Sequence, residues 1–223
     1  MATRVPVVTL LLLMLGASLG ARTGFAAPAE GVDYRRLAAP VADTERDRVS
    51  VLVFFRYGCD VCASVAPALD TYARQRPADV DLVYVPVIAN PQDVGPARLY
   101  YTLQALGLAE RLQSRIYRDV LDPKLRLDLN DKAAVLAWAG RQPGLDPTAF
   151  AKTYESFGVE VKLKGAAREP VRHPGGSLPN VFVDGRYQLQ PGSWPPLMTD
   201  GPEYVRFLEL MNTVVGLARM AAR

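Results

Sequence analysis

The chain has 223 residues, of which 49% are hydrophobic and 22% charged, a composition typical of a folded globular protein. Its 26 basic and 23 acidic residues give a net charge of +3. Because no stripe of lysine and arginine accompanies this small excess, nothing favours a nucleic-acid partner. Two cysteines and one histidine are too few for a typical four-ligand zinc site, so no metal is expected.

Residues 1–29 are typical of a secretory signal peptide. Arg4 supplies the positive start, residues 5–15 form an apolar run, and small residues follow. Cleavage is expected within residues 26–29. An uncleaved anchor is the alternative, although the apolar run is short for a span of about 20 residues. The mature chain, residues 30–223, would keep 24 basic and 23 acidic residues in a compartment where disulfides persist.

After a mixed polar lead-in over residues 30–48, the chain predicts a strand–helix–strand unit. Residues 49–56 (VSVLVFFR) form a β-branched and aromatic run that indicates a central buried strand. Residues 60–76 show apolar side chains at three-to-four spacing, which predicts a helix. Residues 80–88 predict a second strand, parallel to the first.

Residues 93–158 carry no strand signal and predict a helical insert. The helices are expected at residues 96–107, 108–119, 131–141 and 147–157. Residues 159–172 continue as helix or as an irregular connection. The insert therefore separates the first strand–helix–strand unit from the rest of the chain.

The last part of the chain predicts two strands and a helix. Residues 181–183 and 186–189 flank an Asp184-Gly185 pair, the signature of a β-hairpin. Residues 201–223 predict a closing amphipathic helix. The order βαβ, helical block, ββα fits an α/β protein with a thioredoxin fold and a helical insertion between its two halves.

The two cysteines lie three residues apart, Cys59 and Cys62, where the first strand meets the helix. A stabilising disulfide usually closes a longer loop, so the pair favours chemistry. The first amides and the dipole of the helix favour a thiolate at Cys59. We expect Cys59 to be exposed and to exchange with a substrate sulfur. Cys62, one turn into the helix, should be more buried and complete the internal disulfide.

Three segments carry a resemblance to a known family. Residues 54–62 (FFRYGCDVC) resemble the active-site segment of DsbA-type thiol:disulfide interchange proteins, and residues 177–189 (SLPNVFVDGRYQL) resemble the segment around their cis-proline. Residues 31–37 are similar too. The resemblance implies a periplasmic, monomeric catalyst that introduces disulfides into reduced exported proteins. It implies no cofactor beyond the redox-active disulfide, and reoxidation by a quinone-linked membrane partner of the DsbB type.

The resemblance also implies further site residues. Pro179 would be the cis-proline that faces the disulfide, although an ordinary trans turn proline is the alternative. The backbone of Leu178 would then pair with an extended substrate peptide. Asp60 and Val61, between the cysteines, would contact the substrate.

The sequence departs from the family where the thiolate is stabilised. The usual Pro-His pair between the cysteines is Asp60-Val61, so a histidine is missing and a negative charge is added beside Cys59. The family's buried glutamate and its companion lysine, which the resemblance implies would assist proton movement near the buried sulfur, fall on Val53 and Tyr84. Pro67, five residues after Cys62, instead makes the predicted helix resemble the kinked helix of thioredoxin. These changes leave open how strongly the disulfide oxidises.

Five other side chains suggest packing and not chemistry. His173 is expected to be a bystander in a loop. Trp138 and Trp194 are expected to pack, and Phe54 and Phe55 should belong to the sheet core.

Three alternatives to an oxidant remain. The same chemistry could run in reverse as a reductase or isomerase, although the lead-in is too short for the dimerisation domain that isomerases of this fold add. A binding module or chaperone could hold peptides or Cu(I) through the same thiols. A degenerate fold without catalysis is the last alternative.

Overall fold

The computed structural model describes residues 26–41, 48–125, 127–169, 173, 175–190 and 202–221. Most of the expected signal peptide, and Trp194, lie outside these residues. Within the described part of the chain, no helix is long and apolar enough to cross a bilayer. The signal peptide and its cleavage site stay predictions.

A five-stranded sheet forms the centre of the protein. Its strands are β1 (Tyr34–Arg36), β2 (Val49–Phe55), β3 (Val80–Pro86), β4 (Asn180–Val183) and β5 (Tyr187–Leu189), in the order β1-β5-β4-β2-β3. Strands β2 and β3 are parallel, as the strand–helix–strand unit predicts, and the other neighbours are antiparallel. The Asp184-Gly185 hairpin is confirmed, with positive φ at both turn residues.

Strand β1 was not expected, because residues 30–48 were interpreted as a polar lead-in. It has three residues and buries only Tyr34 of them. A strand this short cannot show the alternation that marks longer strands. Its pairing with β5 nevertheless gives the sheet its outer edge.

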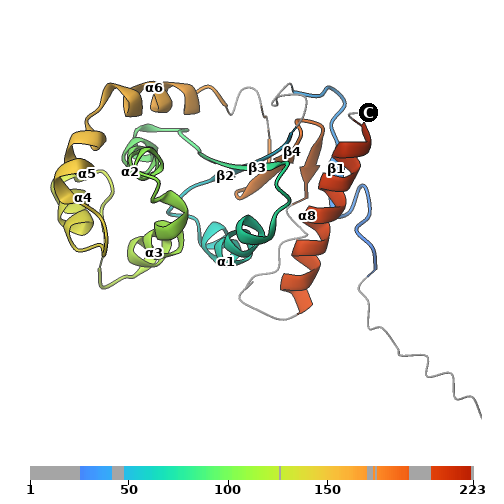
Figure 1. The fold of residues 1–223 in the computed structure, drawn as a ribbon, viewed down its shortest axis with the longest axis horizontal. Helices are drawn as coiled ribbons and strands as arrows, with labels where there is room; N and C mark the ends of the chain where they lie inside the picture. The colour runs from blue at the N-terminus through green and yellow to red at the C-terminus, as the bar shows by residue number, and fades with distance from the viewer. Residues whose placement is uncertain are drawn as a thin grey trace, which may run out of the picture.

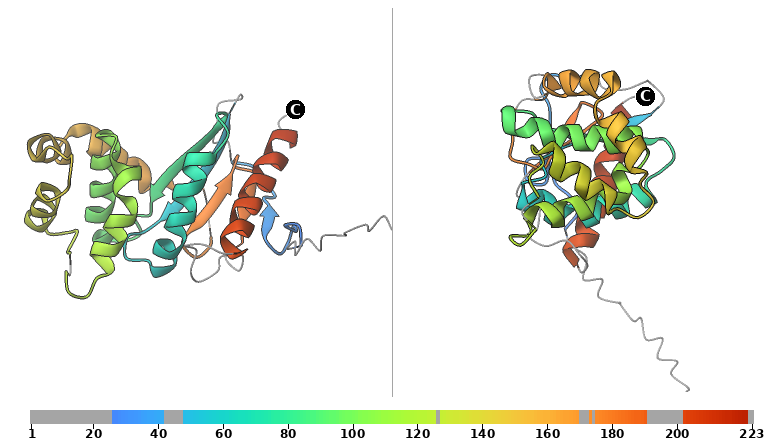
Figure 2. Two further views of the ribbon diagram at one scale, coloured as in Figure 1. Left: turned by 60° about the horizontal axis from the view of Figure 1, so that its bottom comes forward. Right: turned by 90° about the vertical axis from the view of Figure 1, so that its left-hand side faces the viewer.

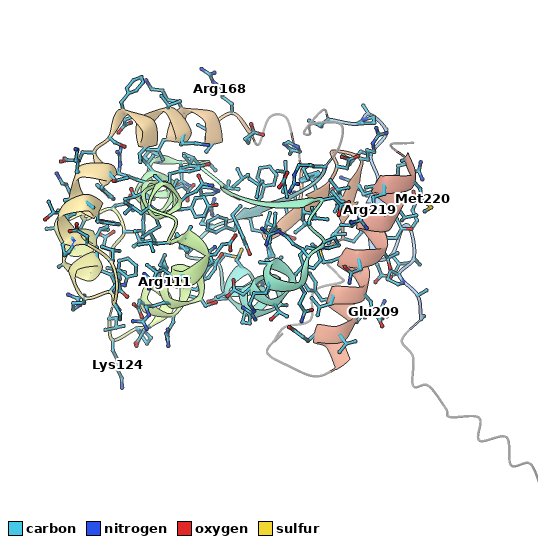
Figure 3. All side chains as sticks on the ribbon, in the orientation of Figure 1. Arg111, Lys124, Arg168, Glu209, Arg219 and Met220 are labelled. Atoms are coloured by element: carbon cyan, nitrogen blue, oxygen red, sulfur yellow. A yellow bond between two sulfur atoms is a disulfide. The ribbon has the colours of Figure 1, made fainter. Side chains whose placement is uncertain are left out.

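Two helices cover one face of the sheet (Figure 1). They are α1 (Asp60–Gln75), which contains Pro67, and α8 (Pro202–Ala221). The helices contact each other, and α8 packs against β2 and β4. Arg219, labelled on α8 in Figure 3, pairs with Asp79 just before β3 at 2.6 Å. This ion pair joins the last helix to the start of an edge strand.

The helical insert lies at one end of the sheet, as Figure 2 shows. It comprises the short 3-10 helix η1 (Pro91–Asp93) and then α2 (Val94–Ala105), α3 (Ala109–Leu121), α4 (Lys132–Gly140), α5 (Pro147–Tyr154) and α6 (Phe157–Ala166). Its helices run past residue 158, where the sequence analysis placed the end of the insert. Trp138 is buried as expected, and its indole N–H donates to Asp119 at 2.8 Å.

The sheet has an apolar core on each face because successive residues of β2 point to opposite sides. Phe55 joins the main core under α1 and α8, while Phe54 joins a smaller cluster with Phe182. Both phenylalanines are buried, as predicted. His173 packs on the smaller cluster, with its ring centroid 5.2 Å from that of Phe54 and 4.9 Å from that of Phe182.

His173 is therefore a packed residue of this second core. It is only 4% exposed, and its Nδ1 lies 3.4 Å from a carboxylate oxygen of Glu169. The expectation of a bystander holds only in that the imidazole lies away from the core that contains Cys62.

Candidate active site

The cysteine pair sits at the amino end of α1. Cys59 caps the helix, and its Sγ accepts a hydrogen bond from the backbone N–H of Cys62 at 3.1 Å. The two residues form a disulfide, with their Cα atoms 5.2 Å apart. Cys62 is 2% exposed, whereas Cys59 is only partly buried. On reduction, a thiolate at Cys59 would face the helix amides that stabilise negative charge.

The segment between α6 and β4 brings a second element to the disulfide. The peptide bond between Leu178 and Pro179 is cis, as the resemblance implied. The carbonyl oxygen of Leu178 lies 3.7 Å from Sγ of Cys59. Pro179 is buried and Leu178 is partly buried. The structure therefore brings together the cysteines and the two residues that the second resembling segment contributes.

The residues between the cysteines lie on the first turn of α1 and face outward. Asp60 is exposed, and Val61 is 46% exposed. They form a surface with one negative and one apolar side chain beside the disulfide. Their geometry permits contact with a substrate.

Aromatic side chains belong to the same buried core as Cys62. Val53 and Tyr84 are direct cross-strand partners in β2 and β3 and are both buried, so neither position supplies a carboxylate or an ammonium group. Burial raises the pKa of Tyr84 well above its usual range. Burial likewise raises the pKa of Tyr57, whose hydroxyl donates to Oε1 of Gln113 at 2.9 Å. These phenols therefore stay neutral at physiological pH.

An ion pair before the cysteines escaped the sequence analysis. Arg56 follows β2, and its Nε lies 2.9 Å from Oδ1 of Asp93 in η1. The other carboxylate oxygen of Asp93 accepts the backbone N–H groups of Ala89 and Asn90, at 2.9 and 3.1 Å. An Asn-Pro-x-Asp pattern, which is typical of a helix start, was the available signal for Asp93. Nothing in the sequence pointed to its partner.

The described residues contain no cluster of three or more histidine, cysteine or acidic side chains that could hold a metal ion. The polar residues Arg35, Gln188 and Asn180 form hydrogen bonds beside the segment that leads to Pro179. Nothing in the sequence indicated a role for these three residues at the site.

A cysteine disulfide at a helix start, opposite a cis-proline, is characteristic of thiol–disulfide oxidoreductases with the thioredoxin fold, and the comparisons place the chain in this class. The chain is 31% identical to the thiol:disulfide interchange protein DsbA of Bordetella pertussis over 93% of its own length and 96% of that protein. It therefore belongs to the DsbA family.

Other comparisons agree. DsbA of Pseudomonas aeruginosa is 24% identical over 96% of this chain and 98% of that protein. The crystal structure of reduced DsbA1 from Neisseria meningitidis matches with a TM-score of 0.74 at 22% identity, covering 88% of this chain and 98% of that one. No protein-family model matches the chain. The fold of these structures confirms the predicted thioredoxin fold with its helical insertion.

Proposed function

We propose that the protein is an exported oxidant that transfers its Cys59–Cys62 disulfide to reduced exported proteins. A substrate thiolate attacks Sγ of Cys59, the Cys59–Cys62 bond breaks, and Cys62 leaves as a thiolate that takes up a proton. A second substrate thiolate attacks the substrate sulfur of the mixed disulfide and releases Cys59. The substrate dithiol is oxidised by two electrons, and the cysteine pair is reduced by two.

One observation carries the assignment of Cys59 as the exchanging sulfur. Cys59 is the partly exposed cysteine of the pair, and its Sγ accepts a hydrogen bond from the backbone N–H of Cys62 at the helix start. A hydrogen bond to the charged form lowers the pKa of a thiol, so Cys59 is the better leaving group in the second step. Cys62 is too buried to meet a protein substrate first.

Substrate binding is proposed at the segment that faces Cys59. An extended peptide would pair with the backbone of Leu178, whose carbonyl lies beside Sγ. Pro179 presents no amide proton to the sulfurs, and Asp60 and Val61 form the surface next to the disulfide.

The surroundings of the reaction are proposed from the sequence and the family. Residues 1–29 would direct the chain to the periplasm, where it would act as a monomer. Since each turnover leaves the cysteines reduced, an external oxidant must restore the disulfide, and a DsbB-type quinone-linked membrane protein is the partner we propose. The disulfide is the sole redox group that this scheme requires.

A reductase or isomerase is the second candidate. It is favoured by Asp60 beside Cys59, which leaves the thiolate with less stabilisation than the family usually provides. Val53 and Tyr84 also supply no charged group to assist proton movement near the buried sulfur. A thiol-dependent chaperone that binds peptides or Cu(I) has only the same two thiols in its support.

The test is to incubate the oxidised protein with a reduced two-cysteine peptide and follow disulfide formation by mass spectrometry. The reduction potential would be measured against glutathione in parallel. We expect stoichiometric oxidation of the peptide by the wild type and none by Cys59→Ser. Reduction of peptide disulfides without oxidation of dithiols would favour the reductase. Equal peptide binding by both proteins without any exchange would favour the chaperone.

A further inference from the structure

Residues 175–177 form the turn that precedes Leu178, and none of them has a buried side chain that could fix the position of the turn. Gly175 and Gly176 have φ values of +86° and +110°, and together with Ser177 they are exposed. Glycine is permissive in this region of φ, but it has no side chain that could be buried. The position of the turn therefore depends on hydrogen bonds to its backbone.

A chain of three side chains supplies such hydrogen bonds. Nε of Arg35 on β1 donates to Oε1 of Gln188 on β5 at 2.7 Å. Nε2 of Gln188 donates to Oδ1 of Asn180 on β4 at 2.8 Å. Nδ2 of Asn180 then donates to the carbonyl oxygen of Gly175 at 2.5 Å, and Nε2 of Gln188 lies 3.4 Å from the same oxygen.

The order of these hydrogen bonds fixes the orientation of each amide. Arg35 can only donate, so it holds the oxygen of Gln188 towards β1 and turns the nitrogen towards Asn180. That nitrogen holds the oxygen of Asn180, which leaves the Asn180 nitrogen to face Gly175. We call Arg35, Gln188 and Asn180 the brace.

The inner members of the brace are shielded from water. Gln188 is 3% exposed and Asn180 is 7% exposed. A Cβ atom placed on Gly176 would lie 2.8 Å from Nδ2 of Asn180, so the turn lies directly against the brace. A buried amide that loses its hydrogen-bond partner costs more free energy than an exposed amide does. The contact of Asn180 with the turn therefore favours one position of the turn.

The brace also connects the turn to the strand that leads to the cysteines. Asn180 follows Pro179 directly and is the register partner of Phe54 in β2. Five residues after Phe54, the same chain reaches Cys59. The Leu178 carbonyl thus lies just before β4, and the Cys59 sulfur lies just after its neighbour β2. The hydrogen bond from Asn180 to the Gly175 carbonyl joins the two ends of the segment between these residues.

We propose that the brace is a positioning network that sets the backbone of Leu178 for the substrate peptide. Arg35, Gln188 and Asn180 do not touch the reacting sulfurs. They act through Gly175 on the segment that the peptide would pair with. This inference rests on the proposed function in one respect, that peptides bind at Leu178.

The experiment compares Arg35→Ala with Arg36→Ala. Both arginines are exposed, both lie on β1, and both changes remove one positive charge, but Arg36 lies over the ring of Tyr187 at 5.3 Å and takes no part in the brace. Gln188→Glu is the second variant, because its carboxylate still accepts from Arg35 but has no proton to donate to Asn180 or Gly175.

Five quantities are measured: KM and kcat for oxidation of the reduced peptide, the rate of reduction by dithiothreitol, the reduction potential, and hydrogen exchange at the amides of Gly176, Ser177 and Leu178. In Arg35→Ala and Gln188→Glu we expect KM for the peptide to rise about fivefold, as for one lost hydrogen bond. Exchange at the three amides should be faster, while the dithiothreitol rate and the potential stay unchanged. Arg36→Ala should match the wild type.

Equal KM and equal amide exchange in all four proteins would overturn the proposal. Faster amide exchange with unchanged KM would also overturn it, because the hydrogen bonds would then be structural only. Failure of the proposed function is distinguishable from both. In that case the wild type reacts with dithiothreitol but not with the peptide, and amide exchange alone decides whether the brace holds the turn.

Discussion

Arg56 and Asp93 form an ion pair that attaches the segment before Cys59 to the first turn of the helical insert, with 2.9 Å between Nε and Oδ1. The Asp93 side chain is only 6% exposed and accepts two backbone N–H groups in addition to the guanidinium. Because removing one partner of a buried ion pair leaves the other groups without compensation, breaking this pair should cost more stability than breaking a surface ion pair.

Asp93→Asn should therefore lower the free energy of unfolding by about 2 kcal/mol, since the amide is uncharged and its nitrogen cannot accept a hydrogen bond as the replaced oxygen does. The matched control is Asp81→Asn, whose partner Arg48 lies at 2.6 Å but on the surface. That change should cost less than about 1 kcal/mol. Urea unfolding followed by circular dichroism measures both. Equal costs would mean that burial of Asp93 does not strengthen its interactions.

In the reduced protein, Cys59 should react with iodoacetamide well before Cys62. The reason is accessibility and charge together: Cys62 is 2% exposed, whereas Sγ of Cys59 lies at the helix start, where a thiolate is favoured. Short alkylation at mildly acidic pH, digestion and mass spectrometry give the order. In urea the two cysteines should react alike, which is the control. Modification of Cys62 first would reverse the two roles.

The reduction potential should lie between those of thioredoxin, about −270 mV, and the strong oxidant DsbA, about −120 mV. The helix start remains, but a histidine is replaced by Val61 and a negative charge is added by Asp60. Val61→His should raise the potential by some tens of millivolts, because about 30 mV corresponds to a tenfold change in the equilibrium constant.

Val61→Asn is the control for that variant, since it adds a polar side chain without a positive charge. The potential is measured by equilibration with glutathione, and the Cys59 pKa by thiolate absorbance. The Cys59 pKa should fall in Val61→His only. A wild-type potential at or above about −120 mV, or equal shifts in both variants, would show that another group controls the thiolate.

Asp70, on α1, and Asp79 should have opposite effects on the stability of the fold at neutral pH. Burial raises the pKa of Asp70, although the hydroxyl of Ser114 at 2.7 Å opposes the shift. The hydrogen bond from Arg219 lowers the pKa of Asp79. A raised folded pKa means that the ionised Asp70 destabilises the fold above about pH 3.8, and that this penalty vanishes at lower pH. The contribution of Asp79 is favourable above its unfolded pKa and is lost as the pH falls through its folded value.

Asp70→Asn should thus raise the urea midpoint at pH 7 and leave it unchanged at pH 3, because the neutral amide can still accept from Ser114. Asp79→Asn should lower the midpoint at pH 7 and have a smaller effect at pH 3. A midpoint that shifts equally at both pH values, in either variant, would mean that the effect is one of packing and not of charge.

The sequence predicted the parts of the fold that repeat a local pattern. The continuous apolar run before Cys59 marked β2, and the Asp184-Gly185 pair marked the hairpin, since its positive φ values suit these residue types. The cis bond before Pro179 came only from the resemblance. Most X-Pro bonds are trans, so composition and periodicity could not have indicated it.

The polar contacts could not be predicted for a physical reason. Asn180 and Gln188 lie on short buried strands, where apolar residues are the rule, and nothing local indicates that their amides face each other across the sheet. The partners Arg56 and Asp93 belong to different elements, and their contact depends on how the insert docks. Likewise, a histidine in a connecting segment is expected to be exposed. His173 is buried because its ring packs on Phe54 and Phe182, a contact that the sequence does not indicate.

The place of that histidine has a consequence for kinetic work. It is the sole histidine of the chain, and it packs on the sheet face opposite the core that contains Cys62. Histidine is the side chain whose ordinary pKa falls between pH 5 and 8. With no imidazole beside Cys59, no histidine titration is superimposed on the curve of exchange rate against pH in this range, and the curve reports the ionisation of the exchanging thiols.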